Sequence, residues 1–222
     1  RWTKSQKKKI IDSRVKSCNL LFEKIKNSKK KPDVFISASA IGFYGSFTSD
    51  DIFDEESQSG NDFLAETVVK WEESVEQIKS LGIRVVKLRT GVVFSKNGGA
   101  LPKMMKPITM GFGSAIGSGK QYVPWIEIRD LARMYLLVIE NPEMNTVYNA
   151  VSPNHIINYD LTKTLAKSLN KAFFMPRIPS IFMKLAFGEM SSILLEGSRV
   201  SSNKIQEAGF EFKFKSIEDV MK

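Results

Sequence analysis

Small and hydroxyl-bearing residues follow a short apolar run near the start of the chain. Val34-Phe35-Ile36 leads into Ser37-Ala38-Ser39-Ala40-Ile41-Gly42-Phe43-Tyr44-Gly45. The hydroxyls of Ser37, Ser39 and Tyr44 could hydrogen-bond a carbonyl or a ribose, and the small residues would leave room for a flat ligand. Ligands of open parallel sheets bind beyond the carboxyl ends of the strands, where this run would lie. A strand that ends in a glycine-rich turn with no ligand is the alternative interpretation.

A second polar position follows another apolar run. In Leu88-Arg89-Thr90-Gly91-Val92-Val93 the guanidinium of Arg89 could pair with a carboxylate or a phosphate. Gly91 has no Cβ and would let the backbone approach a ligand closely. A structural ion pair within the protein is the alternative for Arg89.

The glycine-rich run Gly111 to Gln121 resembles a phosphate-binding loop only at first sight. A Walker loop needs glycine five residues before Gly119, where Ser114 stands, and Ser or Thr after the lysine, where Gln121 stands. The dinucleotide pattern fails as well, because Ile116 takes its third glycine position. We therefore expect a flexible loop on the substrate side.

Histidine and cysteine are almost absent. The chain has one of each, His155 and Cys18, so no metal site can be built from these two residue types, and no metal is expected. A Ser-His-Asp triad would depend on His155, which lies in a loop-like stretch without a visible partner. One cysteine cannot form a disulfide within the chain, which favours a reducing cytoplasmic location.

The net charge of +9 could attract a polyanion. The lysines gather in Lys7-Lys8-Lys9 and Lys29-Lys30-Lys31 without interleaved aromatic residues, so we expect a solvated surface and no nucleic-acid partner. No apolar run approaches the roughly 20 residues that span a bilayer, and no membrane partner is expected.

Helical and strand patterns alternate along the first half of the chain. The spacing of apolar residues predicts helices over 5–27 and 62–80 and strands over 34–40 and 83–89. This order predicts an α/β protein with a parallel sheet and helices on both faces. Further helices are expected around 101–108, 130–140, 159–169, 179–187 and within 193–208, and further strands around 121–128 and 147–150.

Taken together, these segments resemble one family. The Ser37–Gly45 run, the helix Asp62-Phe63-Leu64-Ala65-Glu66 leading to Trp71-Glu72, and Leu88–Val93 are similar in register to the atypical extended short-chain dehydrogenase/reductases, a branch like the NAD-dependent epimerases and dehydratases. Gly117-Ser118-Gly119-Lys120-Gln121, Trp125 to Leu131, and the tail with Leu194-Leu195-Glu196-Gly197 continue the resemblance.

The resemblance implies a Rossmann-like doubly wound parallel sheet with a smaller C-terminal α/β substrate lobe. Residues 1–110 would belong to the dinucleotide-binding domain, with 121–150 partly returning to it, and 151–222 to the substrate side. It also implies an N-terminally truncated chain, lacking about 70 residues with the first strand and the pyrophosphate-binding turn. NADP is the implied cofactor, with NAD as an alternative; the implied partner is a small-molecule substrate, and a homodimer stays open.

The resemblance also implies roles for individual residues. Ser39 would polarise a substrate carbonyl. The implied cofactor-binding residues are Arg14, Ser37, Arg89, Gly91 and Val93, and the implied substrate-binding residues are Gln121 and Trp125.

One departure from the family pattern concerns the catalytic machinery. The superfamily uses a Tyr-x-x-x-Lys pair, yet the helix from Phe63 to Lys70 contains no tyrosine. Tyr44 would have to replace the missing acid if it faces the site. Glu127, where the family usually has histidine, is a second departure. Two functions therefore stay open: an NADP-dependent oxidoreductase or epimerase-like enzyme acting on a carbonyl or sugar substrate through Ser39 and Tyr44, and a non-catalytic NADP-binding sensor or regulatory module.

Overall fold

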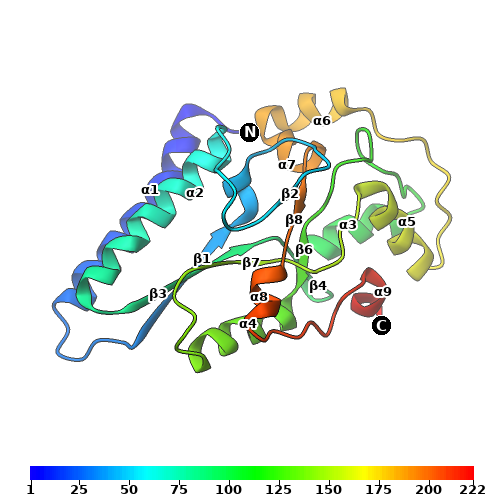
Figure 1. Ribbon diagram of the computed structural model, residues 1–222. Coiled ribbons are helices and arrows are strands. Elements are labelled where there is room, and N and C mark those ends of the chain that lie inside the picture. Colours follow the sequence, from blue (N-terminus) through cyan, green and yellow to red (C-terminus); the bar gives the residue numbers. More distant parts are fainter.

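The computed structural model describes residues 1–222 and begins with a long helix that packs on a second one. Helix α1 (Lys4–Lys26) starts where the hydroxyl of Thr3 accepts the Gln6 backbone N–H, a favourable N-cap. Helix α2 (Phe63–Glu76) starts in the same way, because Asp62 accepts the Ala65 N–H at 2.9 Å. The two helices lie side by side (Figure 1).

The central sheet has three parallel strands in the order β1-β3-β7. Their bounds are β1 (Val34–Ala40), β3 (Arg84–Thr90) and β7 (Val147–Ala150). Side chains of β3 alternate between the two faces: Val85 packs beneath α1 and α2, whereas Val86 and Leu88 pack against the opposite helices. Both faces are thus covered, as the alternating pattern predicted (Figure 1).

The opposite face carries α4 and α8, and a second sheet adjoins it. The second sheet has the order β5-β4-β6, with β4 and β6 parallel and β5 antiparallel. Helix α3 follows β5 and contacts β4. The bounds are β4 (Val92–Ser95), β5 (Gly98–Gly99), α3 (Ala100–Thr109), β6 (Trp125–Glu127), α4 (Ile128–Glu140) and α8 (Asn203–Glu207).

The C-terminal part returns to the beginning of the chain through a short strand pair. Strand β8 (Arg199–Val200) pairs in parallel with β2 (Ile52–Phe53), a segment about 150 residues earlier along the chain. The remaining helices are α5 (Asn158–Ser168), α6 (Ser180–Phe187), α7 (Ser192–Leu195) and α9 (Ile217–Met221), with 3-10 turns at Ile41–Tyr44, Gln77–Leu81 and Gly188–Ser191. The pairing brings residues 192–200 beside the carboxyl ends of the central strands (Figure 1).

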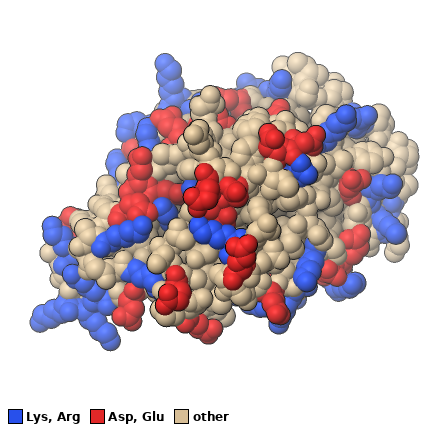
Figure 2. Space-filling model, viewed as in Figure 1, with Lys and Arg blue, Asp and Glu red and all other residues tan.

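Positive and negative side chains are interspersed on the face shown in Figure 2. Many lysines have a carboxylate within 4 Å, including Lys8 with Asp12, Lys70 with Glu66 and Lys79 with Glu76. No helix has both the length and the apolar character needed to cross a bilayer.

Candidate functional site

A cavity of about 310 Å³ lies at the carboxyl ends of β1 and β3. One side is formed by Ala40–Gly42 after β1 and Thr90–Val92 after β3. Residues 121–124 and the C-terminal segment 192–200 form the other side. A second hollow between α1 and α2 is larger, about 630 Å³, but it is shallow and far from the strand ends. The cavity at the strand ends is therefore the candidate site.

Helix α2 presents an apolar stripe to this cavity. Leu64, Thr67, Val68 and Trp71, spaced three and four apart, all line it. Leu64 and Val68 occupy the pair of facing positions that a tyrosine and a lysine four residues apart would need. The Thr67 hydroxyl donates to the carbonyl of Phe63 at 2.7 Å and is not free for a ligand. This helix therefore supplies no proton donor to the cavity.

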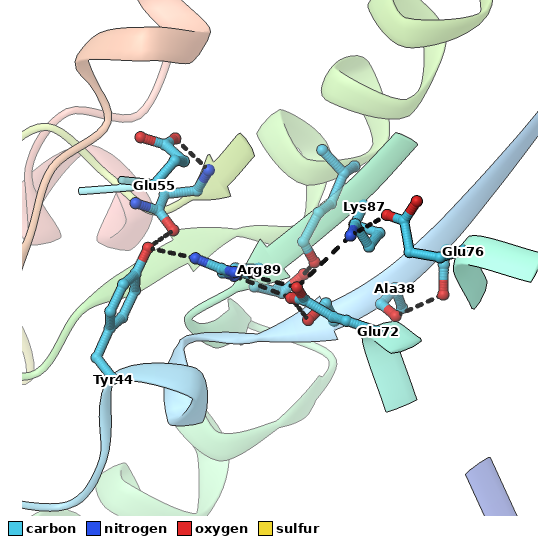
Figure 3. Close-up of polar contacts among 12 residues, drawn as sticks. Ala38, Tyr44, Glu55, Glu72, Glu76, Lys87 and Arg89 are labelled. Carbon is cyan, nitrogen blue, oxygen red and sulfur yellow. Dashed lines mark hydrogen bonds and ion pairs between the residues drawn. The ribbon is translucent and has the colours of Figure 1, made fainter. Parts of the chain in front are cut away.

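Arg89 lies in a buried ion pair and not in the cavity. Its Nε and Nη2 donate to the two carboxylate oxygens of Glu72 at 2.9 and 3.0 Å (Figure 3). Its guanidinium also stacks on Phe43, 3.3 Å from the ring centre. Ser39 donates to the same carboxylate at 2.6 Å. Arg89 was predicted to contact the cofactor and Ser39 to contact the substrate, yet both side chains bind Glu72. A buried guanidinium needs such a carboxylate partner.

The Tyr44 ring lines the cavity, but its hydroxyl points into the interior. The hydroxyl donates to Asn149 Oδ1 at 2.7 Å and accepts from Arg89 Nη1 at 3.2 Å (Figure 3). Burial raises the pKa of Tyr44 to about 12, although the nearby Arg89 charge opposes the shift. Asn149 also donates its backbone N–H to Glu55 at 2.6 Å, and burial raises the pKa of that carboxyl group. Tyr44 is therefore held in its neutral form.

Three other predicted site residues do line the cavity. Arg14 reaches it from α1, with its guanidinium 5.4 Å from the Trp71 ring centre and no carboxylate partner. Gly91 lies on the floor, where a Cβ would stand 2.6 Å from the Pro124 carbonyl oxygen, so its close approach is to the chain itself. Gln121 is buried and donates from Nε2 to the carbonyls of Ile116 and Leu194.

The remaining predicted residues lie elsewhere. The Ser37 hydroxyl donates to the Ala38 carbonyl, and Val93 packs against the core beneath the sheet. Trp125 is 1% exposed and stacks on Phe94 at 5.5 Å. Strand alternation explains Val93, because it turns this side chain away from its cavity-lining neighbour Val92 and toward the core of the central sheet. Trp125 pairs in register with Val92 and is buried with Phe94 in the core beside the second sheet.

No group of three or more His, Cys, Asp or Glu side chains is placed to hold a metal ion. Glu127 is buried and accepts the Arg129 backbone N–H at 2.6 Å, so it caps α4. Glu127, which stands where the family usually has histidine, therefore stabilises the start of this helix.

Some cavity residues that were not predicted do carry a recognisable pattern in the sequence. The α2 stripe repeats at helical spacing and could have been assigned to the strand-end side of the sheet. Tyr122, Ile193 and Leu194 also line the cavity. They carry no such signal, because long-range contacts bring them to the strand ends: β6 pairs with β4 next to Tyr122, and β8 pairs with β2 after Ile193 and Leu194.

Two family models match the chain. The model described as the NAD dependent epimerase/dehydratase family covers residues 1–151, about two thirds of the sequence. A domain of unknown function (DUF1731) covers residues 178–222. The cavity is lined from both matched regions.

Curated relatives align along almost the whole chain. An epimerase family protein of Arabidopsis thaliana, the chloroplastic SDR39U1 homolog, is 34% identical over 100% of this chain and 64% of its own length. The epimerase family protein YfhF of Bacillus subtilis is 33% identical over 98% of this chain and 71% of its own length. The chain thus spans about two thirds of the length of these relatives.

A solved structure of human epimerase family protein SDR39U1 with NADPH superposes with a TM-score of 0.93 at 29% identity, covering 100% of this chain and 75% of that one. A nucleoside-diphosphate sugar epimerase of Corynebacterium glutamicum superposes with a TM-score of 0.81 at 31% identity, covering 43% of that chain. The predicted Rossmann-like α/β fold and family resemblance are confirmed. The chain belongs to the NAD-dependent epimerase/dehydratase family.

Proposed function

We propose that this chain forms the nicotinamide-side part of an NADP(H)-binding protein that does not use side-chain acid–base catalysis. One observation carries the proposal: both predicted catalytic hydroxyls are committed to buried partners. Ser39 donates to Glu72, and Tyr44 donates to Asn149. The other lining hydroxyls described above are also committed: that of Thr67 donates to the Phe63 carbonyl, and that of Tyr122 donates to Asp50. Binding and sensing of the dinucleotide fit this arrangement better than turnover does.

The residues present fit the nicotinamide and ribose part of the cofactor. Ala40, Gly42 and Gly45 line the cavity without bulky side chains, and Arg14 brings a cation without a carboxylate partner. The bound dinucleotide would supply a hydride at its nicotinamide ring. The relative solved with NADPH supports the choice of NADP over NAD.

A second candidate is an oxidoreductase with Tyr44 as the proton donor. It is favoured by one observation, the Tyr44 ring on the cavity wall beside the strand ends. Proton donation would require the hydroxyl to leave Asn149. A pKa of about 12 is also far from the value near the working pH that suits a general acid.

Titration of NADPH into the full-length gene product, followed by nicotinamide fluorescence, tests the binding. Oxidation of NADPH is then measured with carbonyl compounds and with nucleotide sugars, in the wild type and in the Tyr44→Phe and Ser39→Ala variants. We expect saturable binding, weaker in Arg14→Ala, and no turnover. Turnover that falls by about 100-fold or more in Tyr44→Phe would establish the oxidoreductase instead. Absence of NADPH binding would rule out both functions.

A further inference from the structure

The segment that matches the domain of unknown function supplies one wall of the cavity. Ser192, Ile193 and Leu194 of α7 line it, followed by Glu196, Gly197 and Ser198. This wall faces the strand ends and α2, and therefore lies where a molecule beside the nicotinamide would make its contacts. Its chemistry decides which molecule can bind there.

Charged groups are rare around the whole cavity. Arg14 is the only basic residue among its lining residues and Glu196 is the only acidic one. Glu196 accepts a hydrogen bond from the Thr48 hydroxyl at 2.6 Å. Arg14 lies on the α1 side, so the C-terminal wall offers no cation. A nucleoside diphosphate requires cations or clustered backbone donors at its phosphates, and this wall provides no cation for them.

Arg199 lies between two lining residues of the C-terminal wall but is not itself a lining residue. Its neighbours Ser198 and Val200 line the cavity, and alternation along β8 turns the Arg199 side chain to the other side. There its guanidinium lies 5.6 Å from the Tyr122 ring centre.

The wall is held in a fixed position by contacts to the segment before β6. Gln121 donates to the Leu194 carbonyl at 2.8 Å, and the Tyr122 N–H donates to the Gly197 carbonyl at 2.9 Å. A Cβ on Gly197 would stand 2.1 Å from the Tyr122 carbonyl oxygen, so the backbones touch. Such a preorganised wall, with Ile193 and Leu194 as its apolar side chains and no cation, selects by shape and by desolvation.

We propose that this C-terminal wall selects a compact, uncharged and largely apolar ligand and rejects nucleoside-diphosphate sugars. This proposal depends on the proposed function in one respect: the nicotinamide is taken to bind beside this wall. The cavity volume of about 310 Å³ is at the small end of ligand pockets, which supports a compact ligand. Ile193, Leu194 and the α2 residues Leu64 and Val68 would enclose its apolar body.

Ligand-observed NMR titrations of the full-length protein test the selection, with acetophenone as the uncharged aromatic probe and UDP-glucose as the nucleotide-sugar probe. The informative variant is Ile193→Asp, because Ile193 is 50% exposed and a carboxylate there is tolerated by the fold. The matched control is Ile181→Asp on α6, 56% exposed and outside the cavity. We expect acetophenone to bind about tenfold more weakly to Ile193→Asp and unchanged to Ile181→Asp, with no UDP-glucose binding to either.

Two results would overturn the selection proposal. One is UDP-glucose binding to the wild type as tightly as acetophenone, above all if Arg199→Ala abolishes it. The other is absent acetophenone binding, or binding equal in both variants. Titrations are run with and without NADPH, so a protein that binds acetophenone but not NADPH contradicts the proposed function and leaves the wall proposal supported.

Discussion

Arg89 is 4% exposed, and all the partners of its guanidinium come from the protein itself. Glu72 takes two of its hydrogen bonds, Tyr44 a third, and Phe43 stacks on its face. The position after a buried strand could have served a phosphate equally well. What decides the outcome is Glu72, which α2 places opposite the strand end, one turn beyond the cavity-facing Val68.

Removal of either partner of this pair should strongly destabilise the fold. We expect Glu72→Leu to lower the free energy of unfolding by about 3–5 kcal/mol, because it leaves the buried Arg89 guanidinium without a carboxylate partner. Arg89→Met should cost less, because Glu72 keeps the Ser39 hydroxyl as a donor and Lys87 Nζ at 3.8 Å. The double variant should lose much less than the sum of the two. Glu66→Leu on the same helix, in the exposed pair with Lys70, should change stability by about 0.5 kcal/mol or less. Urea unfolding measures all four, and additive losses would contradict a direct coupling.

Tyr44 predicts a pH dependence with a definite sign. Its pKa is raised to about 12 in the folded protein, whereas an unfolded tyrosine titrates near 10, as a model tyrosine does. The neutral hydroxyl therefore contributes fully below pH 10, and its contribution is lost as the pH rises from 10 to 12. The stability advantage of the wild type over Tyr44→Phe should shrink by about 2–3 kcal/mol across that window. An advantage that stays constant in urea unfolding at pH 9 and pH 11.5 would contradict the buried neutral phenol.

At the scale of elements, the strongly periodic segments were predicted closely. The expected helix over 5–27 is Lys4–Lys26, and the strand over 34–40 has the same bounds in the structure. The predicted helix over 62–80 ends earlier as an α-helix and continues as a 3-10 turn from Gln77. These segments succeed because burial of one face imposes a regular spacing of apolar residues over their length.

Short strands that pair over long distances were not predicted. Strands β2 and β8 have two residues each and no periodicity of their own. The second sheet begins directly after Gly91, where the chain leaves the central sheet and β4 pairs with β6.

Only four of the nine predicted site residues line the cavity. Strand ends can be located from sequence, but side-chain direction there depends on partners such as Glu72 and on distant segments.

Gly197 lies at the contact that positions the C-terminal wall. We expect Gly197→Ala to cost about 1–3 kcal/mol of stability, because the new methyl group would meet the Tyr122 carbonyl at 2.1 Å and the backbones must separate. Gly98→Ala is the control, since a Cβ there meets nothing within 4 Å. Hydrogen exchange should increase at Tyr122 in the first variant alone. Equal stability of both variants would show that the C-terminal wall can move away from Tyr122 without a loss in the free energy of unfolding.

At the scale of the whole molecule, the excess of positive charge lies in α1 and the segment after it. Residues 1–33 hold 12 basic and 3 acidic side chains, whereas the rest of the chain is balanced. Ion pairs neutralise part of this charge, because Lys7 pairs with Glu189 and Lys8 pairs with Asp12. Lys29 to Lys31 follow the end of α1, and the face in Figure 2 mixes both signs of charge.

The lysine runs of this segment have no interleaved aromatic residues for base stacking, which predicts weak and unspecific contact with nucleic acid despite the net charge of +9. In fluorescence anisotropy with a labelled DNA duplex, we expect no saturation below about 100 µM at physiological salt. Exposed charges farther apart than the Debye length of about 8 Å act almost independently under these conditions. Binding at low salt should be lost on modest addition of salt, with a shallow slope from few phosphate contacts. Micromolar affinity at physiological salt, with a slope that falls in a Lys29→Ala/Lys30→Ala/Lys31→Ala variant, would instead identify that lysine run as a binding site.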